Sequence, residues 1–211
     1  MALSTSEYWE LIHAERSRLA HVLDALTERQ WRSASLCDGW TVEHVTAHVT
    51  AAANAGRWAW LRSIARAGFD PDKHNSRRLA SYLGSTPQET GARFRDSVNL
   101  TVAPTKDYAA WLGEVIVHGQ DIARPLDITL TPDPVALQEV ATFFVAKDFA
   151  VNTRTAVAGL RVEASDAAFA VGDGPLVRGS LVSVVMAMAG RCDYLAELDG
   201  DGVADLRCRV E

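Results

Sequence analysis

The chain has 211 residues, of which 48% are hydrophobic and 23% charged, so it can bury a core and is neither disordered nor fibrous. A net charge of -6 at pH 7, without a dense Lys/Arg cluster, argues against a nucleic-acid partner. No run approaches the ~20 apolar residues of a membrane span, and the acidic N-terminal region does not fit a secretory signal. Three widely spaced cysteines without a CxxC pattern favour a reducing compartment, so we expect a cytoplasmic protein.

Capping residues and helical spacing predict a series of helices in the first part of the chain. Ser4 and Glu7 form a capping box for a helix over residues 5–26. Thr41 is a suitable N-cap for a second helix, which we expect to end near Gly68. The helical periodicity of both segments predicts one apolar face for each helix.

Proline marks the boundaries of the helices that follow. A short helix is expected over residues 79–83, and Thr86 with Pro87 begins a long helix that runs to about residue 102. The next helix covers residues 106–123 and stops before Pro125, and Asp133 with Pro134 begins another.

The composition changes at Gly159, where the short runs LRVEAS, AFAVGDG and PLVRGS are separated by Gly, Asp and Pro. This pattern is typical of small antiparallel strands. A helix over residues 181–198 follows, and the last stretch, GVADLRCRV, is compatible with a strand or a helical tail. The sequence therefore predicts a mainly α protein, with a helical bundle over residues 1–155 and a small α+β domain over residues 156–211.

Two of the predicted helices carry polar residues four positions apart among apolar ones. They are His44 and His48 in TVEHVTAHV, and Glu114 and His118 in WLGEVIVHGQDIARP. Four residues make about one helical turn, so Glu114 and His118 share a face, and a histidine from another helix can complete a three-ligand metal set. His48 lies on the apolar face of its helix and His44 at the edge, so we prefer His48 as the ligand.

Each of these side chains also has a structural interpretation. An inward histidine is often a hydrogen-bonded core residue, and Glu114 with His118 could be a pair on the helix surface. However, a carboxylate among Trp111, Leu112, Val115 and Ile116 costs several kcal/mol to bury in its ionised form unless a cation or hydrogen-bond donor pairs with it. A divalent metal ion is one such cation.

Two segments resemble a known family. LCDGWTVEHVTAHV is similar to a signature of the mycothiol-dependent maleylpyruvate isomerase-like proteins, which are DinB-like metal-binding four-helix bundles, and EVIVHGQDIARPL resembles their second signature, in the same order. The segments GLRVEASD and VGDGPLVRGSLVSVVMAMAGR resemble the family's C-terminal α+β domain. The resemblance implies a DinB-like four-helix bundle followed by a small α+β domain.

The resemblance also implies a function and a set of site residues. His48, Glu114 and His118 match the metal ligands of the family, and Arg191 matches an arginine that the C-terminal domain supplies to the active site. We expect zinc, or another divalent metal, and mycothiol as cofactors. The metal would bind the thiol, and the enzyme would act on a small electrophilic substrate by isomerisation or thiol transfer. The expected partners are small molecules, with the protein a monomer or a homodimer.

Several assignments remain open at this level. Asp121 either orients a ligand or is a solvated carboxylate, and Arg124 either binds a carboxylate or complements its helix end. Some tryptophans either line a pocket or belong to the core, and no cysteine has the pattern of a nucleophile. Two other functions are a metal-dependent hydrolase and a non-catalytic ligand-binding protein. The tryptophans in question are Trp40, Trp58, Trp60 and Trp111.

Overall fold

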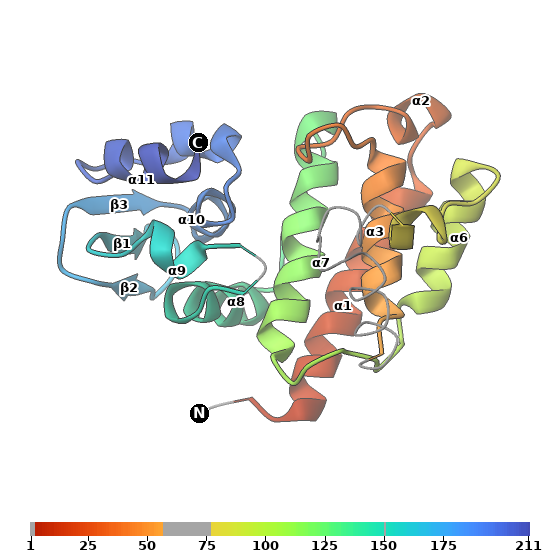
Figure 1. Ribbon diagram of the computed structural model, residues 1–211, viewed down its shortest axis with the longest axis horizontal. Coiled ribbons are helices and arrows are strands. Elements are labelled where there is room, and N and C mark those ends of the chain that lie inside the picture. The colour runs from red at the N-terminus through yellow and green to blue at the C-terminus, as the bar shows by residue number, and fades with distance from the viewer. Residues whose placement is uncertain (1–2, 57–76, 150) are drawn as a thin grey trace. The chain divides into compact units, whose positions relative to one another are not determined.

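A computed structural model describes residues 3–56, 77–149 and 151–211 of the chain (Figure 1). The chain divides into two compact units, Met1–Thr131 and Pro132–Glu211. Among the described helices, none has the length and hydropathy of a membrane span.

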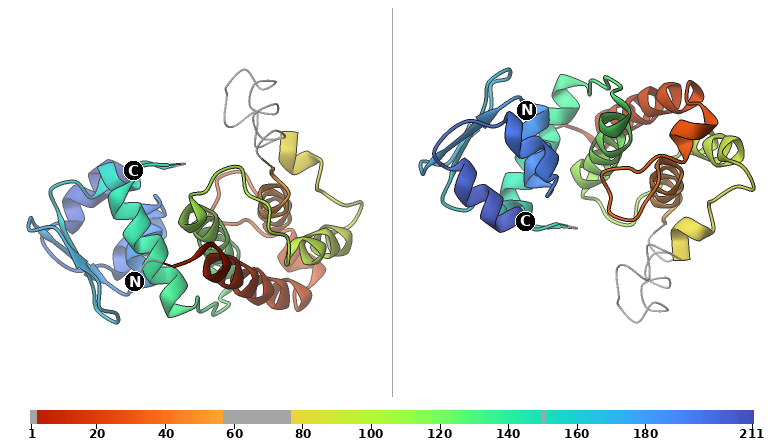
Figure 2. Two further views of the ribbon diagram at one scale, coloured as in Figure 1. Left: turned by 90° about the horizontal axis from the view of Figure 1, so that it is seen from below. Right: turned by 90° about the horizontal axis from the view of Figure 1, so that it is seen from above.

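The described part of the first unit forms a bundle of the four helices α1, α3, α6 and α7 (Figures 1 and 2). Helix α1 (Thr5–Asp24) packs against α6 (Pro87–Ser97) and α7 (Tyr108–Ala123), and α3 (Val42–Ala53) packs against the same two helices. The bundle expected from the sequence is thus confirmed. One cluster of buried apolar side chains forms much of its core: Leu19, Ala20, Leu23, Leu26, Trp31, Val42, Val45, Val49, Phe94, Val98, Val115 and Ile122.

The starts of α1, α3 and α6 agree with the prediction because local capping sets them. The side chains of Ser4, Thr41 and Thr86 accept hydrogen bonds from the backbone N–H groups of Glu7, His44 and Glu89. A four-residue helix that was not predicted, α2 (Glu28–Trp31), is capped by Thr27 in the same way.

The predicted helix ends are less accurate. Helix α3 ends at Ala53 rather than near Gly68, because Asn54 caps it and donates from its side-chain amide to the carbonyl of Thr50. The positions beyond Gly56 that were assigned to this helix lie outside the described residues.

Helix α6 ends at Ser97 rather than near residue 102, and Arg16 donates to the carbonyls of Ser97 and Leu100 at this end. Residues 77–80 form one helical turn, slightly before the predicted range of 79–83. Helix α7 continues into a short 3-10 turn, η1 (Arg124–Leu126).

The second unit is an α+β structure built on a three-stranded sheet. Strand β1 (Arg161–Ala164) lies between β2 (Ala170–Val171) and β3 (Leu176–Gly179). It pairs with β2 in antiparallel and with β3 in parallel orientation, so the expectation of purely antiparallel strands is wrong. The mixed α and β composition of this region is confirmed.

The parallel pairing requires the chain to cross from one edge of β1 to the other after β2. The crossing uses Gly172, whose φ is +76°. A Cβ atom at this position would lie 2.0 Å from the carbonyl oxygen of Leu160. Only glycine fits here, because its backbone adopts positive φ freely and it carries no Cβ.

Helix α8 (Pro134–Ala146) belongs to the second unit, which moves the boundary from the expected residue 155 to Thr131. The physical reason is that α8 packs against α9 (Thr153–Ala156) and α10 (Leu181–Met188). Helix α10 ends at Met188 rather than continuing to residue 198, because Gly190 follows with a φ of +82°.

After α10 the chain forms a 3-10 helix, η2 (Cys192–Glu197), so Arg191 does not lie on a long helix as predicted. The last segment is helical, α11 (Val203–Val210), which decides between the two interpretations of GVADLRCRV.

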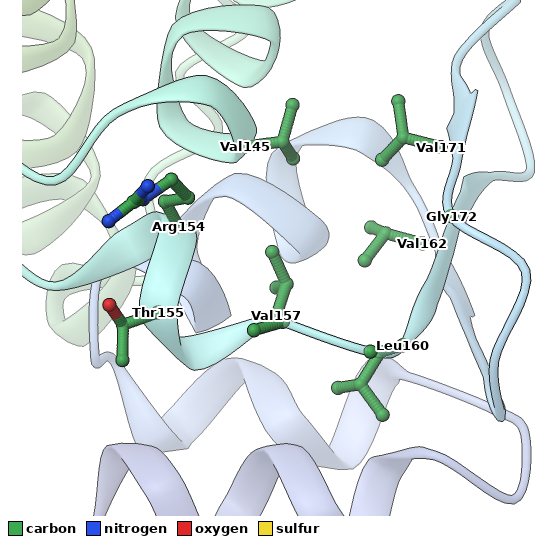
Figure 3. Close-up of a pocket in the computed structure, with 10 residues that line it drawn as sticks. Val145, Arg154, Thr155, Val157, Leu160, Val162, Val171 and Gly172 are labelled. Carbon is green, nitrogen blue, oxygen red and sulfur yellow. The ribbon is translucent and has the colours of Figure 1, made fainter.

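A cavity of about 490 Å³ lies in the second unit between α8, α9 and the sheet (Figure 3). Its walls are mainly apolar, and the guanidinium at its rim, Arg154, is paired with the Asp148 carboxylate. The lining contains no histidine, cysteine or carboxylate that could ligate a metal. The apolar lining residues labelled in Figure 3 are Val145, Val157, Leu160, Val162 and Val171.

Candidate metal centre

The three predicted ligands lie together inside the bundle. His48 projects from α3, and Glu114 and His118 project from α7, one turn apart. Oε1 of Glu114 is 2.8 Å from Nε2 of His48 and 3.7 Å from Nε2 of His118. The two imidazole centroids are 4.9 Å apart. Two helices therefore bring two nitrogens and one oxygen to one point.

This donor set fits a divalent metal ion. Zinc with bonds of ~2.0–2.1 Å in tetrahedral geometry holds its ligand atoms about 3.4 Å apart, and the two separations measured from Oε1 lie on either side of this value. All the ligand atoms of the three residues are within 4.8 Å of one another. Two imidazoles and one carboxylate leave a coordination position open, as in catalytic rather than structural sites.

Solvent reaches the cluster. The side chains of His48 and His118 are 13% exposed, and that of Glu114 is 21% exposed. A small molecule from solution can therefore reach the side chains of the cluster.

Asp121 orients His118. Nδ1 of His118 lies 2.8 Å from Oδ2 of Asp121, whose side chain is completely buried. A carboxylate only accepts, so Nδ1 carries the proton and Nε2 is directed to Glu114. Metal-ligating histidines commonly show this arrangement, because the carboxylate fixes both the tautomer and the ring orientation. Of the two roles considered for Asp121, the orienting one agrees with this contact.

Cys37 is a neighbour of the site that the sequence analysis did not identify. Its Sγ donates to Oδ2 of Asp121 at 3.2 Å and lies 3.7 Å from Nδ1 of His118. The backbone N–H of Leu36 also donates to the carbonyl of Asp121 at 3.1 Å. The available signal was the position of Cys37 in the LCDGW segment, directly before the helix that carries His48.

Cys37, His118 and Asp121 form a second group with suitable spacing for a metal. It would need Nδ1 of His118 as a ligand, and that nitrogen already donates to Asp121. The group formed by His48, Glu114 and His118 is therefore the better metal site.

His118 is strongly perturbed in the protein without metal. Burial lowers its pKa, but the charge of Glu114 and the hydrogen bond to Asp121 outweigh that effect and raise the pKa to about 10. The imidazolium lies between two carboxylates, so a metal that binds at Nε2 must displace a proton.

The remaining candidates lie near the site or elsewhere. Nδ1 of His44 accepts from the backbone N–H of Thr41 and completes the start of α3, which agrees with the choice of His48. The Trp40 ring packs 5.1 Å from the His48 ring, and Nε1 of Trp111 donates to the carbonyl of Thr105. The other two tryptophans considered, at positions 58 and 60, lie outside the described residues.

The two arginines considered lie in different units of the chain. Arg124 is exposed at the C-terminal end of α7, where a cation complements the helix dipole. Arg191 belongs to the second unit, where its Nη1 donates to the carbonyl of Ala189 at 2.6 Å. Its assignment as a catalytic residue stays a prediction.

Comparison with known proteins supports the resemblance found in the sequence. Residues 12–104 match the family model described as the mycothiol maleylpyruvate isomerase N-terminal domain. Among solved structures, the chain resembles the crystal structure of the mycothiol-dependent maleylpyruvate isomerase, with a TM-score of 0.67 and 18% identity over 94% of this chain and 93% of that chain. A His-to-Ala mutant of that enzyme matches with a TM-score of 0.64 at the same identity and coverage.

The matches cover the fold and part of the candidate site. No curated protein matches the sequence. The likeness at 18% identity establishes the fold. The matched family range includes His48 and Cys37, whereas Glu114 and His118 follow it.

Proposed function

We propose, on the basis of the match of residues 12–104 to the model of the mycothiol maleylpyruvate isomerase N-terminal domain, that the chain is a divalent-metal-dependent enzyme that uses mycothiol. The reaction is the isomerisation of a small electrophilic substrate or the transfer of the thiol to it. The observation that carries this proposal is the convergence of His48, Glu114 and His118 on one solvent-accessible point.

The proposed cofactor set follows from the donors. We propose zinc, because two imidazoles and one carboxylate are typical ligands of catalytic zinc. The metal would lower the pKa of a bound thiol from ~8.5, so that thiolate exists at neutral pH. Metal binding at Nε2 of His118 would release the proton of that nitrogen to solvent.

The protein's own residues prepare the site for this chemistry. Asp121 keeps Nε2 of His118 aimed at the shared point, and the Trp40 ring restricts the His48 ring by packing beside it. The Glu114 carboxylate supplies one negative charge, which leaves a dication with net positive charge to attract an anionic thiolate. In the isomerisation, the substrate gains the thiolate at a conjugated double bond, rotates about the resulting single bond and releases it.

A first experiment measures zinc content and turnover together. We expect about one zinc per chain in the wild type and its loss in His48→Ala and Glu114→Ala. His21→Ala, which changes an exposed histidine on α1, should keep the metal. The zinc protein should then convert maleylpyruvate or another electrophile only when mycothiol is present.

Each outcome of this experiment has a distinct meaning. Turnover without a thiol would instead indicate a metal-dependent hydrolase, because the same donors can activate water. Tight binding of a small molecule without turnover would indicate a ligand-binding protein. A wild type that takes up no zinc on titration would overturn the proposal.

We also propose that Arg191 binds a carboxylate of an acidic substrate. Arginine presents donors in a fork that matches a carboxylate. Arg191→Gln should raise KM for an acidic electrophile and leave KM for a neutral one and the zinc content unchanged. Arg178→Gln, at an exposed arginine of β3, is the matched control. Equal effects on both electrophiles would contradict this role.

The proposed location is the cytoplasm. This proposal rests on the cysteine pattern of the sequence, in which three widely spaced cysteines without a CxxC motif favour a reducing compartment.

A further inference from the structure

Arg16 on α1 is a buried cation with an unused donor. It is 3% exposed, and its Nη1 donates to the carbonyl oxygens of Ser97 at 3.3 Å and Leu100 at 2.9 Å. Its Nε has no hydrogen-bond partner. Among the described residues, it is the one buried side-chain N or O atom without a partner. Burial lowers the pKa of Arg16 to about 10, so the guanidinium is still charged at neutral pH. A buried donor without an acceptor is costly, so we expect an acceptor, such as a water molecule, next to Nε.

A small cavity lies beside Arg16 and reaches one of the candidate metal ligands. Its volume is about 10 Å³, and its polar walls include Arg16 and Glu114. This volume matches one water-sized sphere, and a buried water needs two to four polar partners. Among the lining residues, Arg16 has an unpartnered donor and Glu114 has a carboxylate that can accept. The remaining lining residues are Val49, Ala52, Ala53, Val102, Trp111 and Val115.

We propose that this cavity binds one water molecule, which accepts from Nε of Arg16 and donates to the Glu114 carboxylate. Arg16 is then a positioning residue that holds Glu114 in the orientation required for the metal. This inference rests on the metal site proposed above. It assigns a role to a residue that shares no helix with any of the three ligands.

Two effects of Arg16 on the metal would have opposite signs, which makes the inference testable. The positive charge of Arg16 repels a dication, so its loss through charge alone would tighten zinc binding. Loss of the water bridge would release Glu114 and weaken zinc binding, as removal of groups that orient a ligand commonly does by about 10- to 100-fold. The direction of the change therefore separates the two effects.

The experiment uses the full chain and two substitutions with different chemistry. Arg16→Met removes the charge and the donor, whereas Val49→Ile fills the cavity with one methylene and keeps the charge. Arg18→Met, at a partly exposed arginine on the same helix, is the control for loss of charge. Zinc affinity is measured by competition with a chromophoric chelator, with thermal unfolding as the check of folding. A crystal structure of the metal-free wild type locates the water.

We expect one ordered water within hydrogen-bond distance of Arg16 Nε. Zinc affinity should fall about 10- to 100-fold in both Arg16→Met and Val49→Ile and stay near the wild-type value in Arg18→Met. A dry cavity, unchanged affinity in Val49→Ile, or tighter binding in Arg16→Met would overturn the inference. If Arg16→Met does not fold, Val49→Ile and the crystal structure still decide.

Failure of the proposed function has a different signature. In that case the wild type binds no zinc, or His48→Ala still binds it. Either result would also contradict the role of Arg16 in positioning a metal ligand. The crystal structure then tests the water bridge by itself, because the cavity and the Nε atom are present without metal.

Discussion

Asp121 holds the imidazole of His118 through a hydrogen bond of 2.8 Å between Nδ1 and Oδ2. Asp121 is fully buried, so water does not compete for this contact. Both residues lie on α7, three positions apart, and the same helix supplies Glu114. One helix thus carries two candidate ligands and the group that orients one of them.

The substitution Asp121→Asn should weaken zinc binding about 10- to 100-fold. An amide is neutral and presents both a donor and an acceptor, so it holds the Nδ1-protonated tautomer of His118 less firmly than a carboxylate does. The measurement is zinc affinity by chelator competition. Asp127→Asn, at an exposed aspartate just beyond the same helix, is the control and should bind zinc like the wild type. Equal affinities for wild type and Asp121→Asn would show that this contact does not support the site.

The metal-free protein should lose stability as the pH rises from about 6.5 to about 10. Burial alone would lower the pKa of His118, but Glu114 and Asp121 raise it to about 10, compared with 6.5 for an unperturbed histidine. The folded state therefore binds a proton more tightly than the unfolded chain, and the resulting stabilisation is complete below pH 6.5 and lost through pH 10. Urea unfolding in the presence of a chelator, at several pH values, measures this trend.

Glu114→Gln is the comparison that assigns the trend to His118, because other groups also titrate near pH 10. The substitution removes the carboxylate charge that raises the His118 pKa, so the decline in the free energy of unfolding should be shallower. The same slope in both proteins would show that the decline arises elsewhere.

The starts of α1, α3 and α6 were predictable from sequence, whereas the ends of α3 and α6 were not, for a physical reason. Ser4, Thr41 and Thr86 cap their own helices through contacts three residues away, which a sequence pattern contains. The end of α6 depends on Arg16, which reaches it from α1. The parallel pairing of β3 likewise depends on a crossing through Gly172 that composition does not reveal.

The candidate site divides in the same way. The spacing of Glu114 and His118 predicts a shared helix face, and the resemblance adds His48. Cys37 and Arg16 carry no such spacing, because their contacts with Asp121 and with the end of α6 join segments far apart in the chain. Only the folded structure brings Cys37 to Asp121 and Arg16 to the end of α6.

The three cysteines should differ in reactivity toward iodoacetamide. Cys208 is exposed on α11 and should react first. Cys37 is half-buried, and its thiol donates to Asp121 at 3.2 Å, so it should react last. Peptide mapping by mass spectrometry after timed labelling measures the order, and labelling in denaturant is the control in which the differences disappear. Labelling of Cys37 as fast as Cys208 would contradict the described contact.

The final prediction concerns the bundle core. Phe94 is fully buried on α6, within the cluster that contains Leu19, Trp31 and Val45. Phe94→Ala should reduce the free energy of unfolding by about 3–5 kcal/mol, because it removes a large apolar side chain and leaves a cavity. All six tryptophans lie in the first unit, so tryptophan fluorescence during urea unfolding follows the bundle itself.

Phe149→Ala is the matched control, since Phe149 is 42% exposed and belongs to the second unit. Its effect on the same fluorescence transition should stay within about 0.5 kcal/mol, as for most surface substitutions. A small loss for Phe94→Ala would mean that the helices close over the missing ring. In that case the positions of His48 and Glu114 would shift with α3 and α7, and zinc affinity would fall even though the ligands are intact.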